Sequence, residues 1–233
     1  MRPRRLGISA VLALVAVMVS GGLCSAQAGA GGNSAGYLFL KLDDLNTELV
    51  AAGFNSMPKG MLAWGGYGVG QIGDGKWSIG GVGMGGSAKS PATDDDDPKT
   101  ATLDIGYGGI LVQYNAWSSD KASLGLGAVL GAGTATLTTR RGSIDDFDEL
   151  LGAGNSASLW RPYLMVQPQA SIAFPVSMFA DVRITGGYSF FYAPIGWLDG
   201  MNFRNAIDKG PLKTMGIPFI EVGIAFGGPM IVE

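Results

Sequence analysis

Three carboxylates and two arginines lie in stretches that alternate apolar with polar or small residues and contain few other charges. These side chains are the candidates for acid–base chemistry. They are Asp104, Arg161, Asp181, Arg183 and Glu221. Two neighbouring carboxylates can act as general acid and general base. However, three acidic groups against two basic groups also suit a closed polar network inside a fold. We predict the network, and keep a histidine-free enzyme as a remote alternative.

Other catalytic and ligand-binding signals are weak. The chain contains no histidine, which removes Ser-His machinery and the usual zinc ligands. Glycine patterns at 68–73 and 70–76 resemble nucleotide-binding motifs, but neither precedes the helix whose N-terminus must hold the phosphates. The acidic run 94–97 lacks the spacing of a calcium loop. We therefore predict no catalytic residue, no cofactor and no metal.

Composition and the first residues indicate an exported protein. The 233 residues include 39 glycines, 15% charged residues and a net charge of -3, which offers no basic surface for nucleic acid. Residues 1–28 combine early arginines, an apolar stretch at 6–19 and Ala26-Gln27-Ala28, as in a signal peptide. Residues 29–35 are predicted to be a flexible lead. The single cysteine, Cys24, lies in the predicted signal.

The long stretch 160–192 predicts two paired strands. Trp160, Leu164, Val166 and Ile172 alternate with Arg161, Gln167, Gln169 and Ser171, and the second half repeats this alternation. Side chains of a strand point to opposite faces in turn, so the hairpin has one apolar and one polar or small face. We place its turn at 175–177. The strand at 101–116 likewise puts Leu103, Ile105, Tyr107 and Leu111 opposite Asp104.

The whole chain can be divided in the same way. We predict strands at 37–42, 61–72, 77–87, 101–116, 122–138, 160–174, 178–192 and 217–227. Short helices are expected at 43–51, 143–152 and 201–207 in the long loops. Connections alternate between short and long, which indicates an all-β, up-and-down antiparallel barrel of eight strands spanning 36–228. Residues 229–233 form a C-terminal tail.

This pattern resembles the small outer-membrane β-barrel proteins of bacteria, in architecture rather than by a specific motif. Members of that class have short turns at one end, long loops at the other, an apolar outer face and two aromatic girdles. The resemblance implies contact with outer-membrane lipid and a monomer. It assigns Trp64, Trp160, Tyr163, Tyr192 and Trp197 to the long-loop girdle. The opposite girdle would contain Trp77, Trp117, Phe174, Phe179 and Phe226.

Function follows from these expectations only in outline. We predict a non-enzymatic outer-membrane protein with a structural, adhesive or small apolar-ligand role, and an envelope partner or ligand at the long-loop side. The alternative is a soluble periplasmic or secreted barrel that binds an apolar ligand inside. The two differ in which way Leu124, Leu164, Val166 and Val182 point, because a soluble barrel would turn them inward.

Overall fold

The computed structural model describes residues 29–94, 97–142, 156–199, 206–207 and 210–227. The predicted signal peptide, the C-terminal tail and the helix expected at 143–152 lie outside these residues. So does most of the helix expected at 201–207. Its last two residues, Ala206 and Ile207, form a short strand, so a helix is wrong there. No helix in the described residues is long and apolar enough to cross a membrane.

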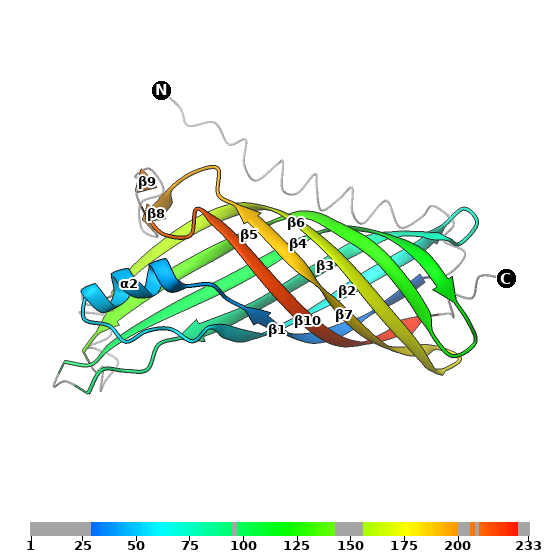
Figure 1. Cartoon of the computed structure of the whole chain (residues 1–233), viewed down its shortest axis with the longest axis horizontal. Coiled ribbons are helices and arrows are strands. Elements are labelled where there is room, and N and C mark those ends of the chain that lie inside the picture. Colours follow the sequence, from blue (N-terminus) through cyan, green and yellow to red (C-terminus); the bar gives the residue numbers. More distant parts are fainter. Residues whose placement is uncertain (1–28, 95–96, 143–155, 200–205, 208–209, 228–233) are drawn as a thin grey trace, which may run out of the picture.

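Eight long antiparallel strands form a closed barrel (Figure 1). They are β1 (Gly29–Phe39), β2 (Gly60–Ile72), β3 (Trp77–Lys89), β4 (Lys99–Ser118), β5 (Ser123–Arg141), β6 (Ser156–Ser177), β7 (Ala180–Tyr192) and β10 (Thr214–Gly227). Their order is β5-β4-β3-β2-β1-β10-β7-β6, and β5 also pairs with β6. Because the last pairing joins the two ends of this order, the predicted up-and-down barrel is confirmed.

Three small elements lie at one end of the barrel. Helix α2 (Asp43–Ala51), as expected from the sequence, follows β1. Strand β8 (Trp197–Asp199) pairs with the start of β6, and β9 (Ala206–Ile207) pairs with β8. Figure 1 shows these elements at the end away from the short turns. The long connections therefore meet at one mouth of the barrel.

The first strand is longer than the sequence indicated. Residues 29–35, expected to be a flexible lead, belong to β1 and pair with both β2 and β10. That prediction is wrong because a strand between two partners is held by backbone hydrogen bonds, which glycine and alanine supply as well as larger residues do. With 11 residues, β1 is long enough for a membrane crossing of about 9–11 residues.

The turn of the β6–β7 hairpin also differs from the prediction. Met178 and Phe179 form the turn, and the register shifts between Pro175 and Ser177. The predicted position at 175–177 is therefore wrong by two to three residues. A β-bulge adds an unpaired residue to one strand, which the alternation of side chains did not reveal.

The apolar face of the barrel points outward. Leu164 is 59% and Val166 48% exposed, whereas their neighbour Gln167 is only 1% exposed. Leu124 and Val182 are partly exposed and lie on the outward rows of β5 and β7. The barrel therefore has an apolar exterior, the opposite of the soluble alternative.

The lumen is filled by side chains and has two halves. Near the short turns it is polar, and the Ser171 hydroxyl donates to Gln113 Oε1 at 3.4 Å. Near the long loops it is apolar, with Leu38, Leu103, Ile105 and Tyr107 buried. The alternation in the sequence predicts that Leu103, Ile105 and Tyr107 lie on the outward, apolar face of β4. That expectation is wrong, because at this level β4 directs its apolar side chains into the lumen and presents Thr102, Asp104 and Gly106 outward.

Candidate functional site: the long-loop mouth

The five charged residues singled out from the sequence do not form one network. Arg161, Arg183 and Glu221 are buried in the lumen, and Asp181 is half-buried on the inward row of β7. Asp104 instead lies on the outer face of β4, where its carboxylate accepts a hydrogen bond from the Ser87 hydroxyl. The assignment of Asp104 to the lumen is therefore wrong. Asp104 cannot form an acid–base pair with Asp181 or Glu221 across the barrel wall.

Arg161 holds the connection that follows β7 over the mouth. Its Nε donates to the Ile195 carbonyl oxygen at 3.3 Å, and its Nη1 donates to that of Pro211 at 2.7 Å. The guanidinium carbon lies 5.5 Å from the centroid of the Trp197 ring. Within the described residues Arg161 pairs with no carboxylate. Its charge is balanced by carbonyl dipoles and by the face of an aromatic ring.

Two aromatic residues assigned to the outer girdle belong to this same cluster. The Tyr163 hydroxyl donates to the Leu212 carbonyl oxygen at 2.6 Å, and Trp197 Nε1 donates to that of Pro211 at 3.0 Å. Each side chain is 2% exposed. Leu212 has a φ of 66°, a left-handed conformation that costs free energy outside glycine and asparagine. Tyr163 and Trp197 thus close the mouth, and the girdle assignment is wrong for both.

The other predicted girdle residues lie outside the barrel. Trp64, Tyr192, Trp77, Trp117, Phe174, Phe179 and Phe226 are exposed, and Trp160 is half-buried. Trp64 and Tyr192 lie toward the long loops, whereas Trp77, Trp117 and Phe226 lie toward the short turns, as their strand positions require. Their contact with membrane interfaces stays a prediction.

A second polar cluster lies deeper in the lumen. The Arg183 guanidinium carbon is 4.6 Å from the centroid of the Tyr67 ring, and Arg183 also acts electrostatically on Glu221. Within the described part of the chain, Arg183 Nε and Tyr67 Oη are buried without a hydrogen-bond partner. Gly223 makes room for this arrangement, because a Cβ there would lie 3.1 Å from Ser34 Cβ. The surrounding strands enclose the cluster, in which Ser34, Arg183 and Glu221 are buried.

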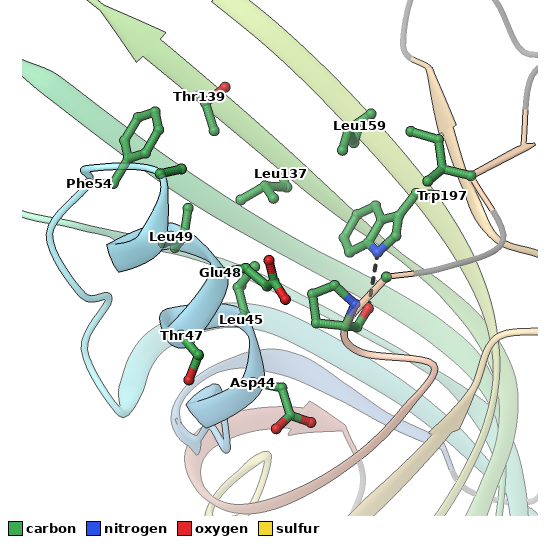
Figure 2. Close-up of a pocket in the computed structure, with 14 residues that line it drawn as sticks. Asp44, Leu45, Thr47, Glu48, Leu49, Phe54, Leu137, Thr139, Leu159 and Trp197 are labelled. Atoms are coloured by element: carbon green, nitrogen blue, oxygen red, sulfur yellow. Dashed lines mark hydrogen bonds between the residues drawn. The ribbon is translucent and has the colours of Figure 1, made fainter.

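The mouth does contain an open pocket of about 750 Å³. Its walls come from α2, from the ends of β5 and β6, and from β8, β9 and the start of the segment leading to β10. The lining residues include Leu45, Leu49, Phe54, Leu137, Leu159, Trp197 and Pro211, together with Asp44, Thr47 and Glu48. Figure 2 shows Glu48 projecting from α2 toward Trp197. A space of this size and character suits a small, mostly apolar molecule.

Sequence reasoning found the helix that forms one wall but not the pocket itself. Leu45 and Leu49 stand four residues apart, as on one helix face, and both are buried. The sequence around Leu137 and Leu159 did not indicate that these residues line a pocket. At these strand ends polar and apolar residues are mixed, so the pattern does not show which face points into the barrel. No group of three potential metal ligands was found among the described residues.

No protein-family model and no curated protein matches the chain. Among solved structures, Ail, the attachment invasion locus protein of Yersinia pestis, has 13% sequence identity and a TM-score of 0.42. The match covers 85% of this chain and 98% of Ail. A major outer membrane protein from Thermus thermophilus has 10% identity and a TM-score of 0.45, covering 86% and 98% of the two chains.

The outer membrane protease OmpT from Escherichia coli has 10% identity and a TM-score of 0.36, covering 86% of this chain and 95% of OmpT. All three TM-scores are below 0.5. The class is defined by the strand pairing itself: the protein is a closed, eight-stranded antiparallel β-barrel with an apolar exterior. That is the architecture of the outer-membrane barrels that the sequence resembles.

Proposed function

We propose that the protein is a non-enzymatic, monomeric outer-membrane β-barrel that binds a small apolar ligand at its long-loop mouth. The observation that carries the proposal is the apolar exterior. Exposed aliphatic side chains occur on seven of the eight barrel strands, and β1 exposes Tyr37 and Phe39. They include Leu62, Ile72, Ile79, Ile110, Val112, Leu126, Leu130, Leu164, Val166, Ile172, Ile184, Ile220, Val222 and Ile224.

This surface is costly in water and favourable in lipid. Monomeric soluble proteins rarely expose one apolar patch larger than about 300–600 Å², whereas here the apolar side chains surround the barrel. In a bilayer, a closed barrel also satisfies every strand edge, so no ladder group faces hydrocarbon unpaired. The aromatic residues toward the two ends, such as Trp64 and Trp77, suit the two membrane interfaces.

The lumen supports a role in binding rather than passage. It is filled along its length by buried side chains such as Leu111, Val129 and Gln167, and the mouth is covered by the segment that Arg161 and Tyr163 hold. Glu221 is enclosed within the barrel rather than in the pocket. The two carboxylates that line the pocket, Asp44 and Glu48, are exposed on helix α2, and we interpret them as a binding rim rather than as a catalytic acid–base pair.

Fractionation tests the location. The full chain expressed in a diderm bacterium should remain with the outer membrane after salt and alkaline washes, and it should be released only by detergent. An unboiled sample should migrate faster on a denaturing gel than a boiled one, because the closed barrel resists the detergent. Recovery of the folded protein in the periplasm without detergent would sink the membrane proposal and favour the soluble alternative.

A further inference from the structure

From the mouth pocket we infer the chemical class of its ligand: a compact apolar molecule that carries one basic nitrogen. The inference rests on the proposed function, since it specifies the ligand of the same site. The apolar body would occupy the floor of the pocket. The nitrogen, charged at neutral pH, would face two carboxylates at the rim.

The floor provides the apolar part of the recognition. Leu45, Leu49, Phe54 and Leu137 are buried beneath the open space, and Trp197 closes one side. The Trp197 ring is fixed in place, since its Nε1 donates to the Pro211 carbonyl oxygen and Arg161 lies against the ring. A fixed indole offers a flat apolar face to a ring-shaped ligand.

The rim provides the charge. Asp44 and Glu48 are four residues apart on α2, and both line the pocket. Asp44 lies in the first helical turn, where the helix dipole stabilises a carboxylate whether or not a ligand is bound. Glu48 stands in the last four residues, where a carboxylate is unfavourable, and that turn contains no basic residue. Helix stability therefore accounts for Asp44 but not for Glu48.

No positive charge in the described residues already neutralises this rim. Lysine and arginine side chains there form no ion pair with Asp44 or Glu48. Two guanidinium groups lie against aromatic rings of the pocket wall instead: the Arg161 carbon is 5.5 Å from the Trp197 ring centroid, and the Arg141 carbon is 5.9 Å from the Phe54 ring centroid. Figure 2 shows Phe54 on the side of the pocket away from Trp197. The acidic rim thus faces an apolar floor, which is complementary to a cationic amphiphile.

Three probes with one ring system test the inference. They are the cation 1-naphthylmethylamine, the neutral alcohol 1-naphthalenemethanol and the anion 1-naphthoate. Binding would be measured by calorimetry on the full chain in lipid nanodiscs, with empty nanodiscs as the reference for partition into lipid. We expect the amine to bind about fivefold more tightly than the alcohol, the upper range for one partly exposed ion pair. Naphthoate should bind most weakly.

Matched variants identify the source of the preference. Glu48→Gln should remove most of the advantage of the amine and leave the affinity for the alcohol within about twofold. Asp43→Asn is the control, because Asp43 is exposed on the same helix but does not line the pocket. Heat-modifiable migration of each variant checks that the barrel is folded.

Each result decides between the two proposals. Equal binding of the amine and the alcohol would overturn the inference and leave the apolar-ligand function standing. If the amine still binds more tightly than the alcohol in both the Glu48→Gln and the Asp44→Asn variants, the inference is also overturned and the apolar-ligand function again stands. If none of the probes binds above the empty nanodiscs, then both the inference and the apolar-ligand function fail.

Discussion

At the scale of single residues, Arg161 organises the mouth of the barrel. It joins β6 to the carbonyl oxygens of Ile195 and Pro211 and supports the Trp197 ring. Without this side chain the Ile195 carbonyl oxygen would lose its arginine donor, and the Pro211 carbonyl oxygen would keep only Trp197 Nε1 as a donor. One arginine therefore fixes one wall of the pocket.

We predict that Arg161→Met destabilises the covering segment while the barrel still forms. Hydrogen bonds to a charged group contribute about 1.5–3 kcal/mol each, and both would be lost. Limited proteolysis should cut the 193–213 connection at least tenfold faster than in the wild type. Arg161→Lys is the matched variant, and it should give an intermediate rate because an ammonium lacks the planar fork of a guanidinium. Equal cleavage rates in all three proteins would contradict the account.

The inward and outward glycines of the barrel wall differ in whether a side chain would fit in their place. A Cβ at Gly80, which faces the lumen, would overlap the Gly68 carbonyl oxygen on the adjacent strand. A Cβ at Gly68, which faces outward, would meet nothing within 4 Å. Only the first position needs glycine for the strands to pair.

We therefore predict opposite effects of the same substitution at these two positions. Gly80→Ala should lower the free energy of unfolding by several kcal/mol or prevent folding, because backbone atoms must move apart. Gly68→Ala should be neutral or stabilise the protein by about 0.5–1 kcal/mol through the lower entropy of the unfolded chain. Urea titrations of both variants in the same lipid vesicles measure the difference. Equal losses at both positions would show that the two faces are assigned wrongly.

At the scale of elements, the alternation of apolar and polar side chains predicted most strands. It failed where the two faces of a strand do not differ in polarity. Strand β6 was found because Gln167 and Gln169 alternate with Leu164 and Val166. Residues 29–35 of β1 gave no such contrast, since their side chains are small on both faces. On β4, Asp104 lies outside and Leu103 inside, because the long-loop half of the lumen is an apolar core. In such strands the sequence shows the two-residue alternation but not which of the two faces points into the lumen.

The outward face of β6 allows a test of the exterior. We predict that Val166→Arg, near the middle of the strand, lowers the stability in lipid by about 2–4 kcal/mol, since a charge is exposed to hydrocarbon there. Val176→Arg, which lies beside the turn, should cost about 0–1 kcal/mol. Both valines are exposed, so burial in protein does not explain a difference. Unfolding by urea in vesicles gives the two values, and a larger cost at Val176 would oppose the proposed membrane position.

At the scale of the whole molecule, we expect the side chains that fill the lumen to prevent ion passage. Arg183, Glu221 and Tyr67 occupy the polar half, and Tyr107 with Phe191 occupies the apolar half, their ring centroids 5.5 Å apart. We expect purified protein in planar bilayers to give no discrete conductance steps at concentrations where a porin does. Regular single-channel steps would show that the mouth and the lumen open together.

The barrel could be predicted from the sequence, whereas the pocket could not. Short and long connections alternate along the chain, so strand order and the side of each loop followed from connection lengths. The pocket combines α2, Leu137 of β5, Leu159 of β6 and Trp197 of β8. These residues meet only because the barrel closes between β5 and β6 and the later connection folds back over the mouth.

The central claim, that the apolar exterior lies in lipid, is tested most directly by quenching from the acyl chains. Single cysteines would replace Val166 and Val176 in a chain with Cys24→Ser, each labelled with bimane and reconstituted with lipids brominated along the chain. The account predicts strong quenching at 166 and little at 176, with aqueous iodide giving the reverse order. Iodide quenching at 166 without quenching by brominated lipid would contradict it.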